Sequence, residues 1–184
     1  MAVKKSFQVF VFVVALAASY AVVTWLKQGV DNTLTNERRA EMVQPPLPDV
    51  TFRDAAGNKV MLRDFRGKVV LVNLWATWCP PCVAELPSLD ILQAKLKDKN
   101  FKVLAISLDR GVSMDKIKAF LDEHDIENLT PYWDENRDIT MKWKYDGIPS
   151  SFLLDRSGNV LMEYQGGLDW ASGNAYDDVM KAVE

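Results

Sequence analysis

The chain has 184 residues, of which 48% are hydrophobic and 26% are charged, a composition typical of globular rather than disordered proteins. Its net charge is -3 and it has no basic patch, so no nucleic-acid partner is expected. Two cysteines are too few for a disulfide framework or a four-ligand zinc site, and the only histidine, His124, lies in a polar stretch typical of an exposed helix end.

The N-terminal part of the chain is predicted to be a membrane anchor. Residues 7–26 are apolar and uncharged, and they follow a short basic N-terminus, residues 1–6. A helix of about 20 residues is about 30 Å long, which matches the hydrocarbon core of a bilayer. The small residues at 15–17 resemble a signal-peptide cleavage site, but the apolar run continues beyond them, so an uncleaved anchor is favoured over a cleaved signal. The short basic end is predicted to stay in the cytoplasm.

A globular domain is predicted to follow a linker. Residues 27–48 are polar and end in a proline-rich stretch, which is typical of a tether, and the domain is expected to span 49–184. Residues 49–62 read as a β-hairpin that turns at 56–58. The continuous apolar run at 68–76 predicts a buried central strand.

Helices and strands are expected to alternate through the rest of the domain. The predicted elements are a helix from about 80 to 96, a strand at 101–109, an amphipathic helix at 113–124, a short strand at 128–135, a short helix at 139–145, strands at 150–155 and 160–165, and a helix at 172–183 with Ser172 or Asn174 as its N-cap. This alternation predicts an α/β domain with a mixed sheet covered on both faces, and with the last two strands as an antiparallel hairpin at its edge.

The two cysteines stand at the junction between the predicted central strand and the helix that follows. The N–H groups and the dipole at a helix N-terminus stabilise a thiolate, so Cys79 is predicted to be the exposed nucleophile and Cys82 to resolve the mixed disulfide. Pro80 and Pro81 between them suit a first helical turn. A structural bridge is a poor alternative because so short a loop gains little entropy, and a metal site would need further ligands.

The segment VVLVNLWATWCPPCVAELP resembles the active-site segment of thioredoxin-fold proteins, most closely those of the TlpA/ResA/CcmG-like family. The resemblance covers about residues 48–183. It implies a three-layer thioredoxin-like fold with an N-terminal β-hairpin and a central insertion between 101 and 135. Pro87 matches the kinking proline of the family's active-site helix, and residues 166–172 match its link into the last helix.

The resemblance also implies a substrate-binding surface around the cysteines. Residues 147–152 resemble the family's cis-proline segment, so the peptide bond between Ile148 and Pro149 is expected to be cis, which leaves the Ile148 backbone available to an extended substrate. The expected substrate-binding residues are Trp78, Pro80, Pro81, Ile148 and Pro149.

An acid within the helix is the third expected catalytic residue. Thioredoxins proper carry a buried acid six residues before the first cysteine, where this chain has Asn73, which cannot shuttle a proton. Glu85 matches the acid of ResA-like members, and its i,i+3 spacing places it on the same helix face as Cys82. Burial would raise its pKa and let it exchange a proton with Cys82; an exposed helix acid is the alternative.

The sequence therefore predicts a membrane-anchored thiol–disulfide oxidoreductase that reduces protein disulfides on the periplasmic side of a bacterial inner membrane. A membrane thiol electron donor would restore the dithiol. The resemblance implies substrates from cytochrome c or copper-centre maturation, and no organic or metal cofactor. A disulfide-forming oxidase and a Cu(I)-binding metallochaperone are the alternatives. A peroxiredoxin is disfavoured because Val72 and Ala76 stand where its motif has proline and threonine.

Overall fold

The structure, a computed structural model, describes residues 47–184. The predicted basic N-terminus at 1–6, the anchor at 7–26 and nearly all of the linker at 27–48 lie outside the described residues. Within the described part, no helix is both long enough and apolar enough to cross a membrane.

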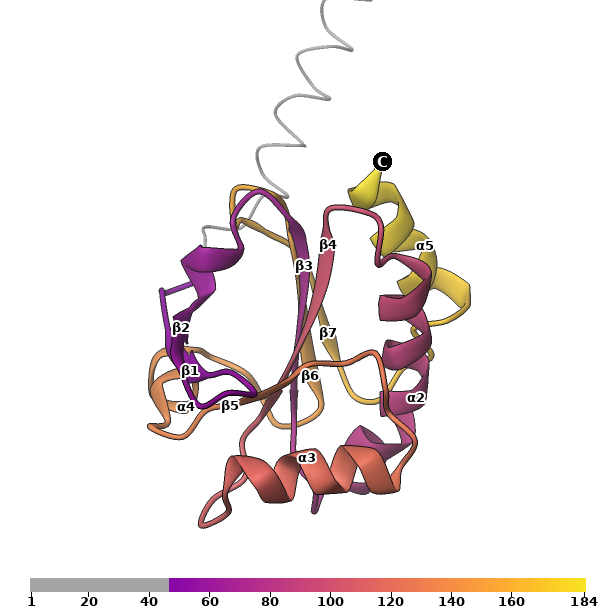
Figure 1. Cartoon of the computed structure of the whole chain (residues 1–184). Coiled ribbons are helices and arrows are strands. Elements are labelled where there is room, and N and C mark those ends of the chain that lie inside the picture. The colour runs from indigo at the N-terminus through magenta and orange to yellow at the C-terminus, as the bar shows by residue number, and fades with distance from the viewer. Residues whose placement is uncertain (1–46) are drawn as a thin grey trace, which may run out of the picture. The chain divides into compact units, whose positions relative to one another are not determined.

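A seven-stranded mixed sheet forms the centre of the domain, in the order β2-β1-β5-β4-β3-β6-β7 (Figure 1). The strands are β1 (Thr51–Arg53), β2 (Lys59–Met61), β3 (Val69–Trp75), β4 (Phe101–Ser107), β5 (Pro131–Trp133), β6 (Ser150–Leu154) and β7 (Val160–Gln165). β3 pairs in parallel with β4 and antiparallel with β6, and every residue of β3 is buried. The predicted buried central strand is therefore confirmed.

Helices cover the two faces of this sheet, as expected. They are η1 (Leu62–Phe65), α2 (Pro80–Lys95), α3 (Met114–Glu123), α4 (Asp138–Lys142) and α5 (Gly173–Val183). Figure 1 shows α2 and α5 next to each other on one side of the sheet and α4 on the other. Because successive strand residues point to opposite faces, Leu71 joins the core cluster beneath α2, α3 and α5, while Val72 joins the cluster that includes Ile139 of α4.

The structure differs from the prediction in several details, among them that α4 ends at Lys142 and not at 145, and that the short helix η1 was not predicted. β6 lies between β3 and β7, so only β7 of the last hairpin forms a sheet edge. Ser172 is the N-cap residue of α5, but its hydroxyl donates to Asp169 Oδ2 at 2.6 Å instead of accepting from the helix, and Asn174 lies inside the helix.

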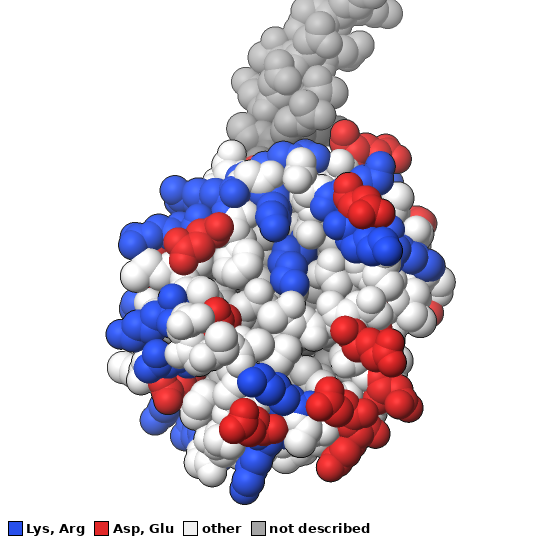
Figure 2. All heavy atoms as spheres, in the orientation of Figure 1, with Lys and Arg blue, Asp and Glu red and all other residues white. Residues whose placement is uncertain are grey.

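On the face shown in Figure 2, basic and acidic side chains both occur, with acidic ones gathered toward the lower right.

Candidate active site

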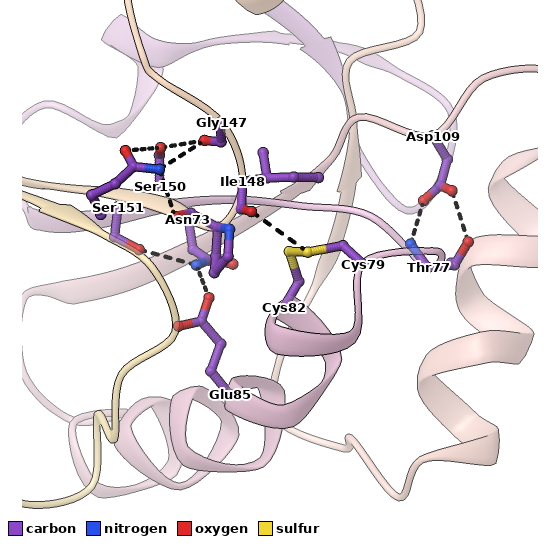
Figure 3. The surroundings of a disulfide bond; sticks show 12 residues. Asn73, Thr77, Cys79, Cys82, Glu85, Asp109, Gly147, Ile148, Ser150 and Ser151 are labelled. Carbon is purple, nitrogen blue, oxygen red and sulfur yellow. Dashed lines mark hydrogen bonds between the residues drawn. A yellow bond between two sulfur atoms is a disulfide. The ribbon is translucent and has the colours of Figure 1, made fainter.

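The two cysteines form a disulfide at the N-terminus of α2 (Figure 3). β3 ends at Trp75, and a short loop leads to Cys79, which is the N-cap residue of the helix. Cys79 is 5% exposed and Cys82 is fully buried, whereas the side chain of Trp78 is 68% exposed. Cys79 is therefore the less buried of the two sulfurs, but it is not exposed as predicted, because the oxidised pair packs into the domain.

The first turn of α2 offers fewer N–H donors than an ordinary helix N-terminus. Pro80 and Pro81 occupy the first helical positions and have no N–H, so Cys82 is the first helical residue that has one. The N–H of Val83 is already donated to the carbonyl of Cys79 at 3.0 Å. Stabilisation of a Cys79 thiolate by this helix end thus rests on the helix dipole and on the Cys82 N–H.

The segment before β6 brings backbone groups to the disulfide. The peptide bond between Ile148 and Pro149 is cis, as expected, and the carbonyl oxygen of Ile148 lies 3.7 Å from Cys79 Sγ (Figure 3). In residues 47–184 neither the N–H nor the carbonyl of Ile148 forms a backbone hydrogen bond, whereas the carbonyl of Pro149 accepts from Gly166 at 2.9 Å. Ile148 therefore keeps its polar backbone groups available beside the reacting sulfur.

Glu85 is buried, which rules out the exposed-acid alternative. It is 3% exposed, and its Oε1 accepts a hydrogen bond from Asn73 Nδ2 at 2.6 Å. Its Oε2 accepts from the backbone N–H of Leu168 at 3.1 Å and from Trp170 Nε1 at 3.2 Å. Burial raises the pKa of Glu85, and the three hydrogen bonds oppose that rise. Figure 3 shows Glu85 and Cys82 on adjacent turns of α2.

Asn73 supports Glu85 from the central strand. It is fully buried, and its Nδ2 also donates to Ser151 Oγ at 3.0 Å, while its Oδ1 has no hydrogen-bond partner among the described residues. An amide can orient a carboxylate without taking its proton, so Asn73 is a positioning residue for Glu85. Its position could have been recognised, because a polar residue in the middle of a buried strand signals a buried partner.

Asp109, just after β4, holds the loop that leads to the disulfide and was missed by the sequence analysis. It is 3% exposed, and its Oδ2 accepts from the Thr77 N–H at 3.0 Å and from Ser107 Oγ at 2.7 Å. Its Oδ1 accepts from Thr77 Oγ1 at 2.7 Å (Figure 3). The neighbouring strand thereby fixes the chain two residues before Cys79.

The link between β7 and α5, residues 166–172, is held to α2 mainly by the side chains of Glu85 and Ser88. Besides the bonds to Glu85, Ser88 Oγ accepts from the backbone N–H of Trp170 at 3.0 Å. The link also passes close to the start of the helix, where a Cβ on Gly167 would lie 3.1 Å from the carbonyl oxygen of Pro81. An open groove of about 630 Å³ lies between α2 and the link, and Glu85 is among the residues that line it.

A Cys-x-x-Cys disulfide at the junction of a central strand and a helix, beside a cis-proline segment, defines the class of thioredoxin-fold thiol–disulfide oxidoreductases. Among residues 47–184 no cluster of three or more histidine, cysteine, aspartate or glutamate side chains could hold a metal ion. The chain belongs to the Redoxin family, whose model matches residues 42–179.

Known relatives support the same assignment. The thiol-disulfide oxidoreductase ResA of Bacillus cereus is 31% identical over 163 residues, which cover 89% of this chain and 90% of that protein. The thioredoxin-like protein YneN of Bacillus subtilis is 33% identical over 114 residues, 61% of this chain and 65% of that protein. A crystal structure described as thiol:disulfide interchange protein DsbE from Chlorobium tepidum has a TM-score of 0.67 at 30% identity, covering 77% of this chain and 98% of that one. The predicted TlpA/ResA/CcmG-like family and the enzyme class are thus confirmed, and the chain is a thiol–disulfide oxidoreductase.

Proposed function

We propose that this oxidoreductase is a membrane-anchored reductant of protein disulfides that works outside the cytoplasm. The observation that supports it most is the placement of Cys79, less buried than Cys82, beside Ile148, whose N–H and carbonyl form no backbone hydrogen bond among residues 47–184. The apolar segment at 7–26 and the polar tether that follows are the sequence features that favour anchoring.

The reaction is a two-step exchange that moves two electrons to the substrate. The Cys79 thiolate attacks one sulfur of the substrate disulfide, which forms a mixed disulfide and expels the other substrate sulfur as a thiolate that takes up a proton. Cys82 loses its proton and attacks Cys79 Sγ, which closes the Cys79–Cys82 disulfide and releases the second substrate thiolate, which is protonated in turn. The substrate gains two electrons from the enzyme and two protons, one released by Cys82 and one that entered solvent when the Cys79 thiolate formed.

Glu85 is the proposed acceptor of the Cys82 proton. A carboxyl group whose pKa is raised by burial stands closer to the operating pH than an exposed one, and it is therefore a better partner for a thiol. Asn73 and Trp170 hold that carboxyl group on the inner side of the active-site helix.

A membrane thiol donor is proposed to restore the dithiol, because an oxidising compartment does not. By family resemblance, the proposed substrates are proteins of cytochrome c or copper-centre maturation. An oxidase with the same pair would have a potential near the upper end of the range of roughly -270 to -120 mV, whereas a reductant would lie near the lower end. A metallochaperone would bind Cu(I) stoichiometrically and exchange disulfides only weakly.

The test is to trap the mixed disulfide in the native membrane. The Cys82→Ser variant should accumulate covalent complexes with substrate proteins, and a reductant should cleave these complexes. The Cys79→Ser variant should form no such complexes and should not turn over. The matched control is the variant that lacks both cysteines. Normal reduction of substrate by Cys79→Ser would overturn the role assigned to Cys79. Equilibration with glutathione measures the reduction potential of the Cys79–Cys82 pair.

A further inference from the structure

A hollow beside Cys79 is separate from the groove that reaches Glu85. Its volume is about 360 Å³, and its lining includes the large apolar or aromatic side chains of Trp78, Leu108, Tyr145 and Ile148. Thr140 of α4 and Arg110 complete the lining, together with Gly147. We call it the Trp78 pocket. It shares no lining residue with the groove along the β7–α5 link.

The Trp78 pocket is continuous with the reacting centre. Trp78 directly precedes Cys79 in the chain, and Ile148, on its lining, has its carbonyl oxygen 3.7 Å from Cys79 Sγ. A polypeptide whose cysteine reaches Cys79 and whose backbone bonds to Ile148 therefore passes the mouth of the pocket. Extended chains advance about 3.3 Å per residue, so the pocket is within reach of side chains close to the attacked cysteine.

One side of the pocket depends on α4. Asp134 Oδ1 accepts from the N–H of Ile139, and its Oδ2 accepts from the N–H and hydroxyl of Thr140 at 3.1 and 3.0 Å. Asp134 is 3% exposed, so these hydrogen bonds at the start of α4 lie inside the folded domain. The pocket is therefore formed in the oxidised protein before any partner binds.

The pocket has a single charged residue, the exposed Arg110. No aspartate or glutamate of the described domain lies within salt-bridge distance of its guanidinium. The carboxylate of the preceding residue, Asp109, is turned inward and bound by Thr77 and Ser107. An arginine at the rim of an apolar pocket favours a partner that brings both an apolar side chain and a carboxylate.

We propose that the Trp78 pocket selects substrates by sequence: it takes an apolar side chain close to the attacked cysteine, while Arg110 pairs with an acidic residue of the same segment. The partner is thus a protein disulfide flanked by a large apolar residue and an aspartate or glutamate. This inference rests on the proposed function, because it assigns specificity to the same reaction.

The experiment measures how fast the reduced full-length chain, in mild detergent, reduces four peptides. The peptides share one disulfide and differ only near the attacked cysteine, where they carry phenylalanine or serine and glutamate or lysine. The second-order rate should be about tenfold higher with phenylalanine than with serine, given the gain from burying an aromatic side chain. It should be about threefold higher with glutamate than with lysine, the scale of an exposed ion pair.

The charge preference should follow Arg110. Arg110→Glu should reverse the preference between the glutamate and lysine peptides, whereas the control Lys144→Glu, an exposed charge outside the pocket, should leave the preference unchanged. Equal rates for all four peptides, or a charge preference that survives Arg110→Glu, would overturn the inference. Rates that fall with rising protein concentration would assign the pocket to a second copy of the chain and overturn it as well.

A small chromogenic aromatic disulfide separates this inference from the proposed function. If wild-type protein reduces that reagent but does not discriminate among the peptides, the pocket assignment fails and the proposed function stands. If wild-type protein reduces neither the reagent nor the peptides, the proposed function fails, and the inference fails with it.

Discussion

At the scale of single residues, Glu85 has two tasks that depend on the same two oxygens. As an acid it is proposed to take the proton of Cys82, and as an acceptor it satisfies the buried donors of Asn73, Leu168 and Trp170. A buried donor without a partner costs about 1–3 kcal/mol. Glu85 therefore contributes to the stability of the site as well as to its proposed chemistry.

The free energy of unfolding should depend on pH because Glu85 titrates differently in the folded and unfolded protein. Burial raises its folded-state pKa above the ordinary 4.5, so between 4.5 and the folded pKa the folded protein holds a proton that the unfolded chain has released. The free energy of unfolding therefore falls as pH rises through that window. Glu85→Gln lacks this titration, so urea unfolding from about pH 4 to about pH 8 should show the variant gaining relative to wild type as pH rises, then levelling off.

The control for this titration is Glu163→Gln, an exposed acid on β7, which should follow the wild-type profile. A difference between wild type and Glu85→Gln that stays constant across the pH range would show that Glu85 is not perturbed in the folded protein.

The residues predicted from sequence are those whose chemistry is encoded locally. Cys79, Cys82 and Glu85 lie within two turns of one helix, where spacing alone determines which side chains share a face. Asn73 and Asp109 act through partners 12 and 32 residues away, across strand and loop boundaries. A local pattern marks such residues as polar and buried but does not identify their partners.

At the scale of elements, apolar runs identified the strands but not their order. The continuous apolar run of β3 and the helix expected from about 80 to 96 were predicted correctly. The interior place of β6 and the pairing of β1 with β5 through Arg53 and Trp133 depend on contacts between distant segments. Strand order is a long-range property, which is why the sequence placed both strands of the last hairpin at the edge.

The loop between β3 and α2 should lose its position when Asp109 is neutralised. Asp109→Asn keeps the shape but replaces one acceptor oxygen with a donor that faces the groups of Thr77 or Ser107. Denaturant unfolding should show a loss of about 1–3 kcal/mol. The rate of disulfide reduction should also fall severalfold, because the loop carries Cys79. The matched control Asp115→Asn alters an exposed acid of α3 and should change neither quantity; an Asp109→Asn protein as stable as wild type would contradict this role.

At the scale of the whole molecule, the catalytic domain is built as a unit of its own. The described residues 47–184 lie in one compact unit, with core clusters on both faces of the sheet. Each hydrophobic layer is closed by helices of the same unit, so we expect this unit to fold without the segment that precedes it.

Removal of the N-terminal segment should therefore change where the protein is located without changing its activity. A chain that begins at residue 44 should unfold at the same denaturant concentration as the full chain and reduce a small disulfide at the same rate, but it should no longer sediment with membranes. In the full-length Cys82→Ser protein, a membrane-impermeant maleimide should label Cys79 in intact cells whose outer membrane has been permeabilised. Labelling only after the inner membrane is lysed would place the domain in the cytoplasm and contradict the proposed location.

The attachment of the β7–α5 link to the active-site helix has a consequence for how such proteins diverge. One oxygen of the carboxylate at position 85 accepts from both the backbone N–H of Leu168 and the indole of Trp170, so a substitution that removes this oxygen leaves both donors without an acceptor, whereas glutamine keeps one. Homologues with neither glutamate nor glutamine at this position should consequently carry compensating changes around positions 168–170, and the two sites should vary together rather than independently.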